Sequence, residues 1–191
     1  MNLNNQISLP SNGGFSANEI NLIHSGDGLM TLYTVENEAE LHFLHQKAVD
    51  LSQSDLLTTE YKRLKDRMLL TVTNPDREGV GIAAPQVGVQ KRLIAVQRLD
   101  LEGMPFRFYV NPVIFGYSQQ KKVGSEGCLS VPDRNGNVNR SLAIKLRYLD
   151  EDTFEIKEEM ITGFTAIIFQ HEVDHLNGVL YIDKLEQKTE V

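Results

Sequence analysis

The segment His171-Glu172-Val173-Asp174-His175 carries the clearest chemistry in this sequence. Two histidines four positions apart on a helix project from one face and can bind one metal ion. Glu172 directly follows the first histidine and can reach a water molecule bound to that metal. The pattern is typical of metallohydrolases. The alternative, two core histidines bonded to backbone carbonyls, leaves the position of Glu172 unexplained.

The third metal ligand is expected upstream of His171. One class of enzymes with this pattern continues to a further histidine, but Tyr181 stands at that position here. Another class takes a glutamate from a second helix, and the sixteen residues after His175 leave no room for one. Glu186 and Glu190 lie in a charged tail without apolar periodicity, which indicates solvated side chains.

Cys128 is the best candidate for that ligand. It is the only cysteine and stands in the segment Glu126-Gly127-Cys128-Leu129-Ser130. A thiolate is a strong ligand for zinc or ferrous iron, and with two imidazoles it leaves one position open for water. His24, His42 and His45 are instead expected at the surface.

A glycine-containing loop, Gly79 to Gln86, offers a second set of groups. Its GxG does not follow a strand and open a helix, so a dinucleotide site is not indicated. Small residues would instead let a substrate backbone approach closely. The Gln86 amide can donate a hydrogen bond to a carbonyl oxygen.

The elements that must hold these groups follow from hydrophobic periodicity. We expect an apolar, buried helix over 163–177 that carries both histidines, with Gly178 as its C-terminal cap. Short strands and two further helices are predicted around it. The strands are 92–97, 106–111, 143–148, 154–158 and a closing strand 179–182, and the helices are 36–51 and 55–73. The fold class is therefore α+β, with short antiparallel strands around the buried C-terminal helix.

Composition narrows the class of protein. The 191 residues carry a net charge of −7, with 41% hydrophobic and 24% charged residues, as in a globular protein of one domain. The negative charge argues against stable nucleic-acid binding. No apolar run is long enough for a bilayer, and no signal peptide is evident, so we expect a cytoplasmic protein with no membrane contact. Residues 1–28 are polar and rich in Asn, Ser and Gly, which predicts a loosely ordered extension.

Three segments together resemble peptide deformylase. The motifs of that family, GxGxAAxQ, EGCxS and QHExDH, stand here in order as Gly79–Gln86, Glu126–Ser130 and Gln170–His175. The resemblance covers about residues 55–185 and makes residues 29–191 one catalytic domain. It implies an enzyme that removes the formyl group from the N-terminal methionine of new proteins and releases formate. The substrates would be N-formyl-methionyl nascent chains, with the ribosome as a further candidate partner.

The resemblance also implies roles for single residues. Cys128, His171 and His175 would hold one divalent metal, Fe²⁺ in the cell, with Zn²⁺ or Ni²⁺ as substitutes after purification. Glu172 would move the proton, while the Gln86 side chain and the Leu129 backbone N–H would stabilise the developing oxyanion. The methionine pocket and peptide contacts are expected from Gly81, Ile82, Gly124, Gly127, Phe164, Ile167 and Ile168.

Glu126, Arg140 and Asp174 are expected to orient the ligands, with a pair between Arg140 and Glu126. Two other functions stay open at this point. One is a different metalloamidase, such as a peptidase, and the other is an inactive relative that only binds peptides.

Overall fold

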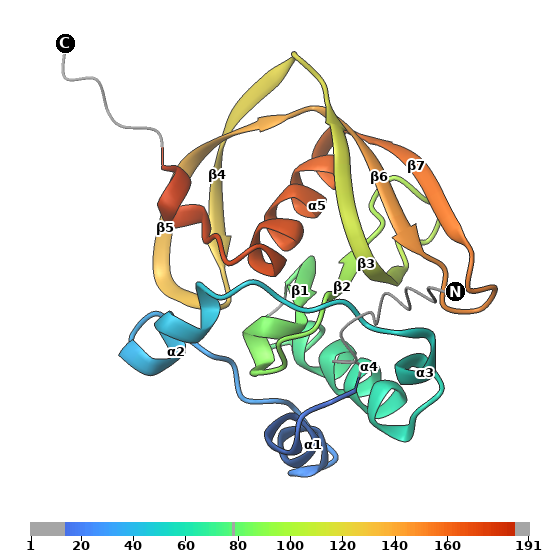
Figure 1. Cartoon of the computed structure of the whole chain (residues 1–191). Helices are drawn as coiled ribbons and strands as arrows, with labels where there is room; N and C mark the ends of the chain where they lie inside the picture. The colour runs from blue at the N-terminus through green and yellow to red at the C-terminus, as the bar shows by residue number, and fades with distance from the viewer. Residues whose placement is uncertain (1–13, 78, 186–191) are drawn as a thin grey trace, which may run out of the picture.

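The apolar helix α5 (Gly163–Leu176) occupies the middle of the molecule (Figure 1). The computed structural model describes residues 14–77 and 79–185. A five-stranded sheet packs along one side of α5, a two-stranded hairpin lies on its other side, and the N-terminal helices lie beneath (Figure 1). Nine of the residues of α5 are buried, as its apolar sequence predicts. Gly178, with φ of 71°, follows its end and confirms the expected cap.

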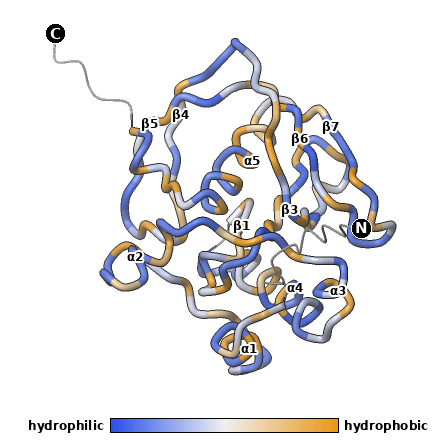
Figure 2. Tube along the Cα trace, viewed as in Figure 1, coloured by the Kyte–Doolittle hydropathy of each residue, from blue (hydrophilic) through white to orange (hydrophobic). Residues whose placement is uncertain are grey.

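The main sheet has the strand order β1-β2-β3-β6-β7, and all neighbours are antiparallel. In β6 the side chains of Ile144 and Leu146 are buried while Lys145 and Arg147 are exposed. This polar–apolar alternation is visible along the tube in Figure 2. The strands are β1 (Gly81–Ala83), β2 (Leu93–Gln97), β3 (Phe106–Tyr117), β6 (Ala143–Leu149) and β7 (Ile156–Thr162). The α+β class with antiparallel strands is confirmed.

A separate hairpin of β4 (Lys121–Cys128) and β5 (Val131–Ser141) connects β3 to β6. Its residues are largely polar, so hydrophobic periodicity did not predict it. The ladder breaks between the pairs Glu126–Gly136 and Cys128–Val131. Residues 132–135 therefore bulge out of β5, and we call them the β5 bulge.

Two predicted helices have different bounds. The helix predicted over 36–51 is shorter, α2 (Glu38–Leu44), because Val49 instead forms a parallel bridge with Lys91. The helix predicted over 55–73 is divided into α3 (Gln53–Leu56) and α4 (Thr59–Val72). The Thr58 side chain accepts a hydrogen bond from the Tyr61 N–H and so starts a new helix at that point.

The expectation of a loosely ordered segment up to residue 28 is wrong for its described part, and residues 1–13 lie outside the described residues. Helix α1 (Ala17–His24) begins with a capping box between Ser16 and Glu19. Its Ile23 is fully buried in the core with α4. A single apolar contact of this kind has no periodic signature in an otherwise polar segment.

The closing strand predicted over 179–182 is also wrong. The chain there forms a 3-10 helix, η2 (Tyr181–Lys184), which packs against β5. A second 3-10 helix, η1 (Ala84–Val87), follows β1 and carries Gln86. Among the described residues, no helix is long and apolar enough to cross a membrane.

Candidate active site and metal centre

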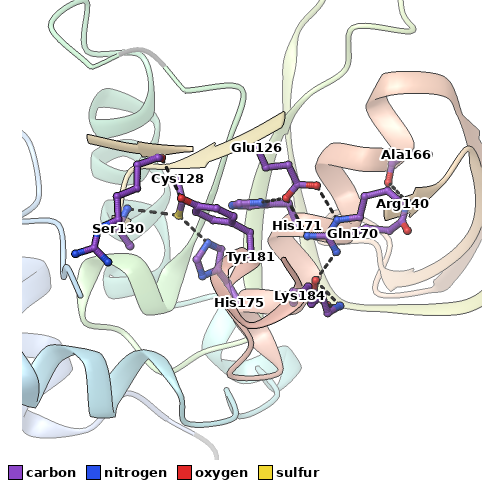
Figure 3. Close-up of polar contacts among 12 residues, drawn as sticks. Glu126, Cys128, Ser130, Arg140, Ala166, Gln170, His171, His175, Tyr181 and Lys184 are labelled. Atoms are coloured by element: carbon purple, nitrogen blue, oxygen red, sulfur yellow. Dashed lines mark hydrogen bonds and ion pairs between the residues drawn. The ribbon is translucent and has the colours of Figure 1, made fainter. Parts of the chain in front are cut away.

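Helix α5 presents His171 and His175 from one face, with ring centroids 5.0 Å apart. The spacing of four residues produces this arrangement, as the sequence predicts. His171 Nδ1 lies 2.9 Å from Glu126 Oε2, so the other nitrogen, Nε2, is available to a ligand (Figure 3). A carboxylate that bonds the second ring nitrogen fixes the tautomer and orientation of a metal-binding histidine.

Cys128 completes a group of three metal-binding side chains. Its Sγ lies 3.2 Å from His175 Nε2, and the ligand atoms of Cys128, His171 and His175 all lie within 4.8 Å of one another (Figure 3). Cys128 reaches this point because it stands where β4 ends, opposite Val131. One thiolate and two imidazoles suit zinc or ferrous iron and leave a fourth position free. The donor set therefore fits a divalent metal.

The charges around the group act in opposite directions on its two histidines. Burial alone would lower the pKa of His171, but hydrogen bonds to Cys128 and Glu126 outweigh it and raise that pKa to about 10, so a metal would have to displace a proton there. Burial, and then the nearby His171, lower the pKa of His175, which keeps that imidazole neutral as a ligand requires. Burial alone would raise the pKa of Glu126. Hydrogen bonds to His171 and Arg140 outweigh it and lower that pKa to about 2, so Glu126 stays anionic.

Glu172 is a buried carboxyl group beside the ligands. Glu172 is 4% exposed, and burial raises the pKa of its carboxyl group to about 7. Its Oε2 has no hydrogen-bond partner among the described residues. A buried carboxylate oxygen without a partner is costly, and it points to a role toward a bound molecule. The α-carbon of Gly81 packs against this carboxylate, and a Cβ there would overlap it.

Gln86 is held in place with its amide donor toward the cysteine. Its Oε1 accepts a hydrogen bond from the Ala83 N–H at 2.8 Å, which orients the side chain. Its Nε2 then lies 3.4 Å from Cys128 Sγ and 3.2 Å from Ser130 Oγ. The donor therefore faces the same space as the three ligand atoms.

A cavity of about 490 Å³ opens in front of these groups. One wall is the stretch Gly79–Gly81, and the other is Ser125–Leu129 with part of the β5 bulge. Of the residues singled out from the sequence, the cavity is lined by Gly81, Gln86, Glu126, Gly127, Cys128, Leu129, Phe164, Ile167, Ile168, His171 and Glu172. His175 lies behind them, 1% exposed.

Two of the sequence-predicted pocket residues do not line this cavity. Ile82 is fully buried in the core cluster with α4, because alternation along β1 turns it away from Gly81. Gly124 lies on β4 outside the lining, with open space at its Cβ position.

An ionic chain supports the ligands from behind. Arg140 donates to both carboxylate oxygens of Glu126, at 2.8 and 3.0 Å, and also bonds Asp174 (Figure 3). Lys184 in turn lies 2.6 Å from both Asp174 oxygens. The predicted pair between Arg140 and Glu126 is confirmed, and it connects α5, the hairpin and η2.

Sequence reasoning missed two contributors. Gln170 lies within the QHExDH segment, and it fastens α5 to β5 through the Ser141 backbone, with bonds of 3.1 and 2.8 Å. Tyr181 stands where a further histidine ligand would be expected, and its sequence position indicates no other role. Its ring stacks on His171 at 6.2 Å with an interplanar angle of 21°. The position of that ring depends on the 3-10 helix, which no local pattern indicated.

Comparison with known proteins agrees with this geometry. A family model described as polypeptide deformylase matches residues 31–191. A peptide deformylase from Leptospira biflexa is 40% identical over 150 residues, which cover 75% of this chain and 82% of that protein. A second, from Rhizorhabdus wittichii, is 42% identical over 118 residues, or 59% of this chain and 66% of that protein.

Solved structures show the same likeness. The class I type b peptide deformylase from Acinetobacter baumannii, bound to Met-Ala-Ser, aligns with a TM-score of 0.73 and 36% identity. That alignment covers 84% of this chain and 100% of the other. The enzyme from Thermotoga maritima aligns with a TM-score of 0.71 and 32% identity, over 83% of this chain and 98% of that one.

Proposed function

The chain belongs to the peptide deformylase family, and we propose that Cys128, His171 and His175 hold one divalent metal at its active site. The protein is a peptide deformylase, an enzyme that removes the formyl group from the N-terminal methionine of nascent peptides. The observation that carries the proposal is the group of three ligand atoms, mutually within 4.8 Å, beside a cavity of about 490 Å³ that Cys128 and His171 line.

A bound divalent metal would act as a Lewis acid that makes water acidic near neutral pH and polarises the formyl oxygen. We propose Fe²⁺ as the native metal, with Zn²⁺ or Ni²⁺ able to replace it. A site of one thiolate and two imidazoles can bind all three metals, so the metal that occupies it depends on metal availability as well as on geometry.

Glu172 is proposed as the general base and acid. The carboxylate accepts a proton from the attacking water and later delivers it to the departing amine nitrogen. Burial supports this role, and so does the Oε2 atom, which has no hydrogen-bond partner within the described part of the chain. A carboxyl pKa raised to about 7 suits a group that must both take and give a proton.

Gln86 and Leu129 are proposed to stabilise the oxygen on the formyl carbon as it gains negative charge. The Gln86 amide already faces the ligands, held by its bond from Ala83. The Leu129 backbone N–H directly follows the proposed cysteine ligand, and Leu129 lines the same cavity. Donors fixed before the reaction need no reorganisation when charge develops.

The methionine side chain is proposed to bind against Phe164, Ile167 and Ile168. These three line the cavity from the first turns of α5. Phe164 is 59% exposed and lines the cavity, so its ring is accessible to an apolar group there. Gly81 and Gly127, on opposite walls, are proposed to face the peptide backbone.

The wider setting is proposed as well. Residues 29–191 are proposed as the catalytic domain, with α1 packed against its core. Its substrates are proposed to be nascent chains at the ribosome in the cytoplasm. The neighbour bound to Met-Ala-Ser supports a peptide of that length in the cleft.

The test is formate release from formyl-Met-Ala-Ser by protein loaded anaerobically with Fe²⁺ and, in parallel, with Zn²⁺. Acetyl-Met-Ala-Ser and an internal-peptide analogue serve as controls. We expect formate from the formyl substrate alone. Cleavage of an internal bond without formate would identify a peptidase, and full metal occupancy with no turnover would leave a peptide-binding protein.

A further inference from the structure

Tyr181 contacts His171 on α5 through its ring and Arg134 on the hairpin through its hydroxyl group. Neither contact has a role in the proposed chemistry. Tyr181 is 2% exposed although it lies in η2, a surface 3-10 helix after the end of α5. Its ring packs in a small core cluster with Val131 and Val138, next to Cys128. The same ring stacks on His171 (Figure 3).

The hydroxyl group of Tyr181 extends beyond this cluster to the β5 bulge. It donates a hydrogen bond of 2.9 Å to the backbone carbonyl of Arg134. A buried tyrosine hydroxyl that donates to a backbone carbonyl restricts the position of that carbonyl, because the hydrogen bond is lost if the carbonyl moves away. The hydroxyl therefore holds the bulge at its middle.

The β5 bulge depends on such support because its own ladder is interrupted. Its residues lie between the pairs Glu126–Gly136 and Cys128–Val131, without the regular pairing of the rest of the hairpin. Asp133 has a φ of 57°, a conformation that non-glycine residues seldom adopt. The adjoining Gly136 packs so closely on Leu185 that a Cβ there would overlap that side chain. Residues 181–185 thus support the bulge from one side, through Tyr181 and Leu185.

The bulge is one rim of the cavity. Asp133, Arg134 and Asn135 all line it. The Asn135 side chain also covers the α-carbon of Gly127, where an added Cβ would lie 2.6 Å from Asn135 Oδ1. A shift of the bulge would therefore move both the rim and the backbone wall at Gly127.

We propose that Tyr181 is a positioning residue for peptide binding, with its ring steadying the His171 imidazole and its hydroxyl holding the cavity rim. The two functions belong to separable parts of one side chain. The hydroxyl acts on substrate residues that reach the rim, and the ring acts on metal retention. The inference rests on the proposed function, since it assigns the cavity to the peptide.

The decisive variant is Tyr181→Phe, which keeps the ring and removes the hydroxyl. One neutral hydrogen bond corresponds to roughly a three- to tenfold change in an equilibrium. We expect KM for formyl-Met-Ala-Ser to rise by about that factor, with kcat and metal content unchanged. Amide hydrogen exchange in residues 133–136 should accelerate by a similar factor. Tyr181→Leu should in addition lose metal to a chelator faster than Tyr181→Phe does.

Tyr61→Phe is the matched control. Tyr61 is equally buried, at 2% exposure, and its hydroxyl donates to Glu151 in a part of the molecule that does not line the cavity. Its loss should lower the midpoint of thermal unfolding without a change in KM or in exchange at the bulge.

Two results would overturn the inference. One is a Tyr181→Phe variant with unchanged KM and unchanged exchange at the bulge. The other is a variant that only loses thermal stability, as the control does. If the wild-type protein released no formate, the proposed function would fail. Hydrogen exchange at the bulge would still test the contact of the Tyr181 hydroxyl, and the rate of metal loss would still test the contact of its ring with His171.

Discussion

At the scale of single residues, the side chains of the site have one polar atom fixed by a hydrogen bond and a second one directed toward the cavity. His171 Nδ1 is hydrogen-bonded to Glu126, and Gln86 Oε1 accepts from the Ala83 N–H. Both residues line the cavity, with His171 Nε2 and Gln86 Nε2 left for other partners. Glu172 is the exception, since its Oε2 is buried with no partner among the described residues. Residues fixed in this way need little reorganisation when substrate binds.

Replacement of Glu172 by glutamine tests its proton-transfer role. Glu172→Gln keeps the shape of the side chain but cannot accept the proton, so activity should fall about 10²–10⁴-fold. Metal content, measured by elemental analysis, should stay at the wild-type level. Glu158→Gln, at an exposed ion pair with Arg147, is the control and should keep full activity. A Glu172→Gln enzyme within a few-fold of wild type would remove this role.

Cys128→Ser tests the third ligand. A hydroxyl is a poor substitute for a thiolate, so the variant should retain less metal after dialysis than wild type. His42→Ala removes an exposed imidazole outside the group and should leave metal content unchanged. Full occupancy in Cys128→Ser would refute the assignment of Cys128.

At the scale of elements, the contact between β1 and α5 sets the position of the general base. Glycine at 81 lets the strand approach the helix until its α-carbon meets the Glu172 carboxylate. The sequence pattern suggested that this glycine admits a substrate backbone. The structure shows that it first admits the neighbouring carboxylate.

Gly81→Ala should therefore reduce activity far more than stability. The added methyl would displace the flexible end of Glu172, and we expect a loss of kcat of at least about tenfold because a misplaced base loses its geometry. The midpoint of thermal unfolding should change by only a few degrees. Gly28→Ala is the control, since an added methyl there meets no atom of the described residues within 4 Å. An active Gly81→Ala enzyme would show that Glu172 can move without cost.

At the scale of the whole molecule, the described part of the N-terminal segment, from residue 14 onward, packs against the core. Arg67 on α4 donates to the carbonyls of Leu22, Ile23, Gly28 and Leu29, at 2.8 to 3.1 Å. Gln90, before β2, donates its N–H to Glu19 at 2.8 Å. These contacts join α1 and the residues after it to α4 and to the segment that leads into β2.

Ile23→Ala should destabilise the protein by about 2–5 kcal/mol, because a fully buried isoleucine leaves a cavity when truncated. Ile20→Ala lies on the same helix at 37% exposure and should cost less than about 1 kcal/mol. Urea denaturation of both variants provides the comparison. Equal small losses would mean that α1 docks without contributing to the core.

The catalytic group is the part that local rules predict well. Four-residue spacing on a helix places two histidines together whatever the rest of the fold does. Tyr181 stands where a downstream histidine ligand would be, and the only cysteine, Cys128, lies upstream. The apolar run from Phe164 predicted a buried helix, and strand alternation at Ile144 and Leu146 predicted the sheet.

The sequence by itself thus determined the reacting groups and the fold class, because both follow from spacing and periodicity. Only the tertiary structure decided what holds them. The β4–β5 hairpin, the docking of Ile23, the Glu172–Gly81 contact and the Tyr181 hydroxyl on Arg134 all join segments far apart in the chain. Such contacts depend on close packing and on the pairing of buried polar groups, which leave no periodic trace in the residues that make them.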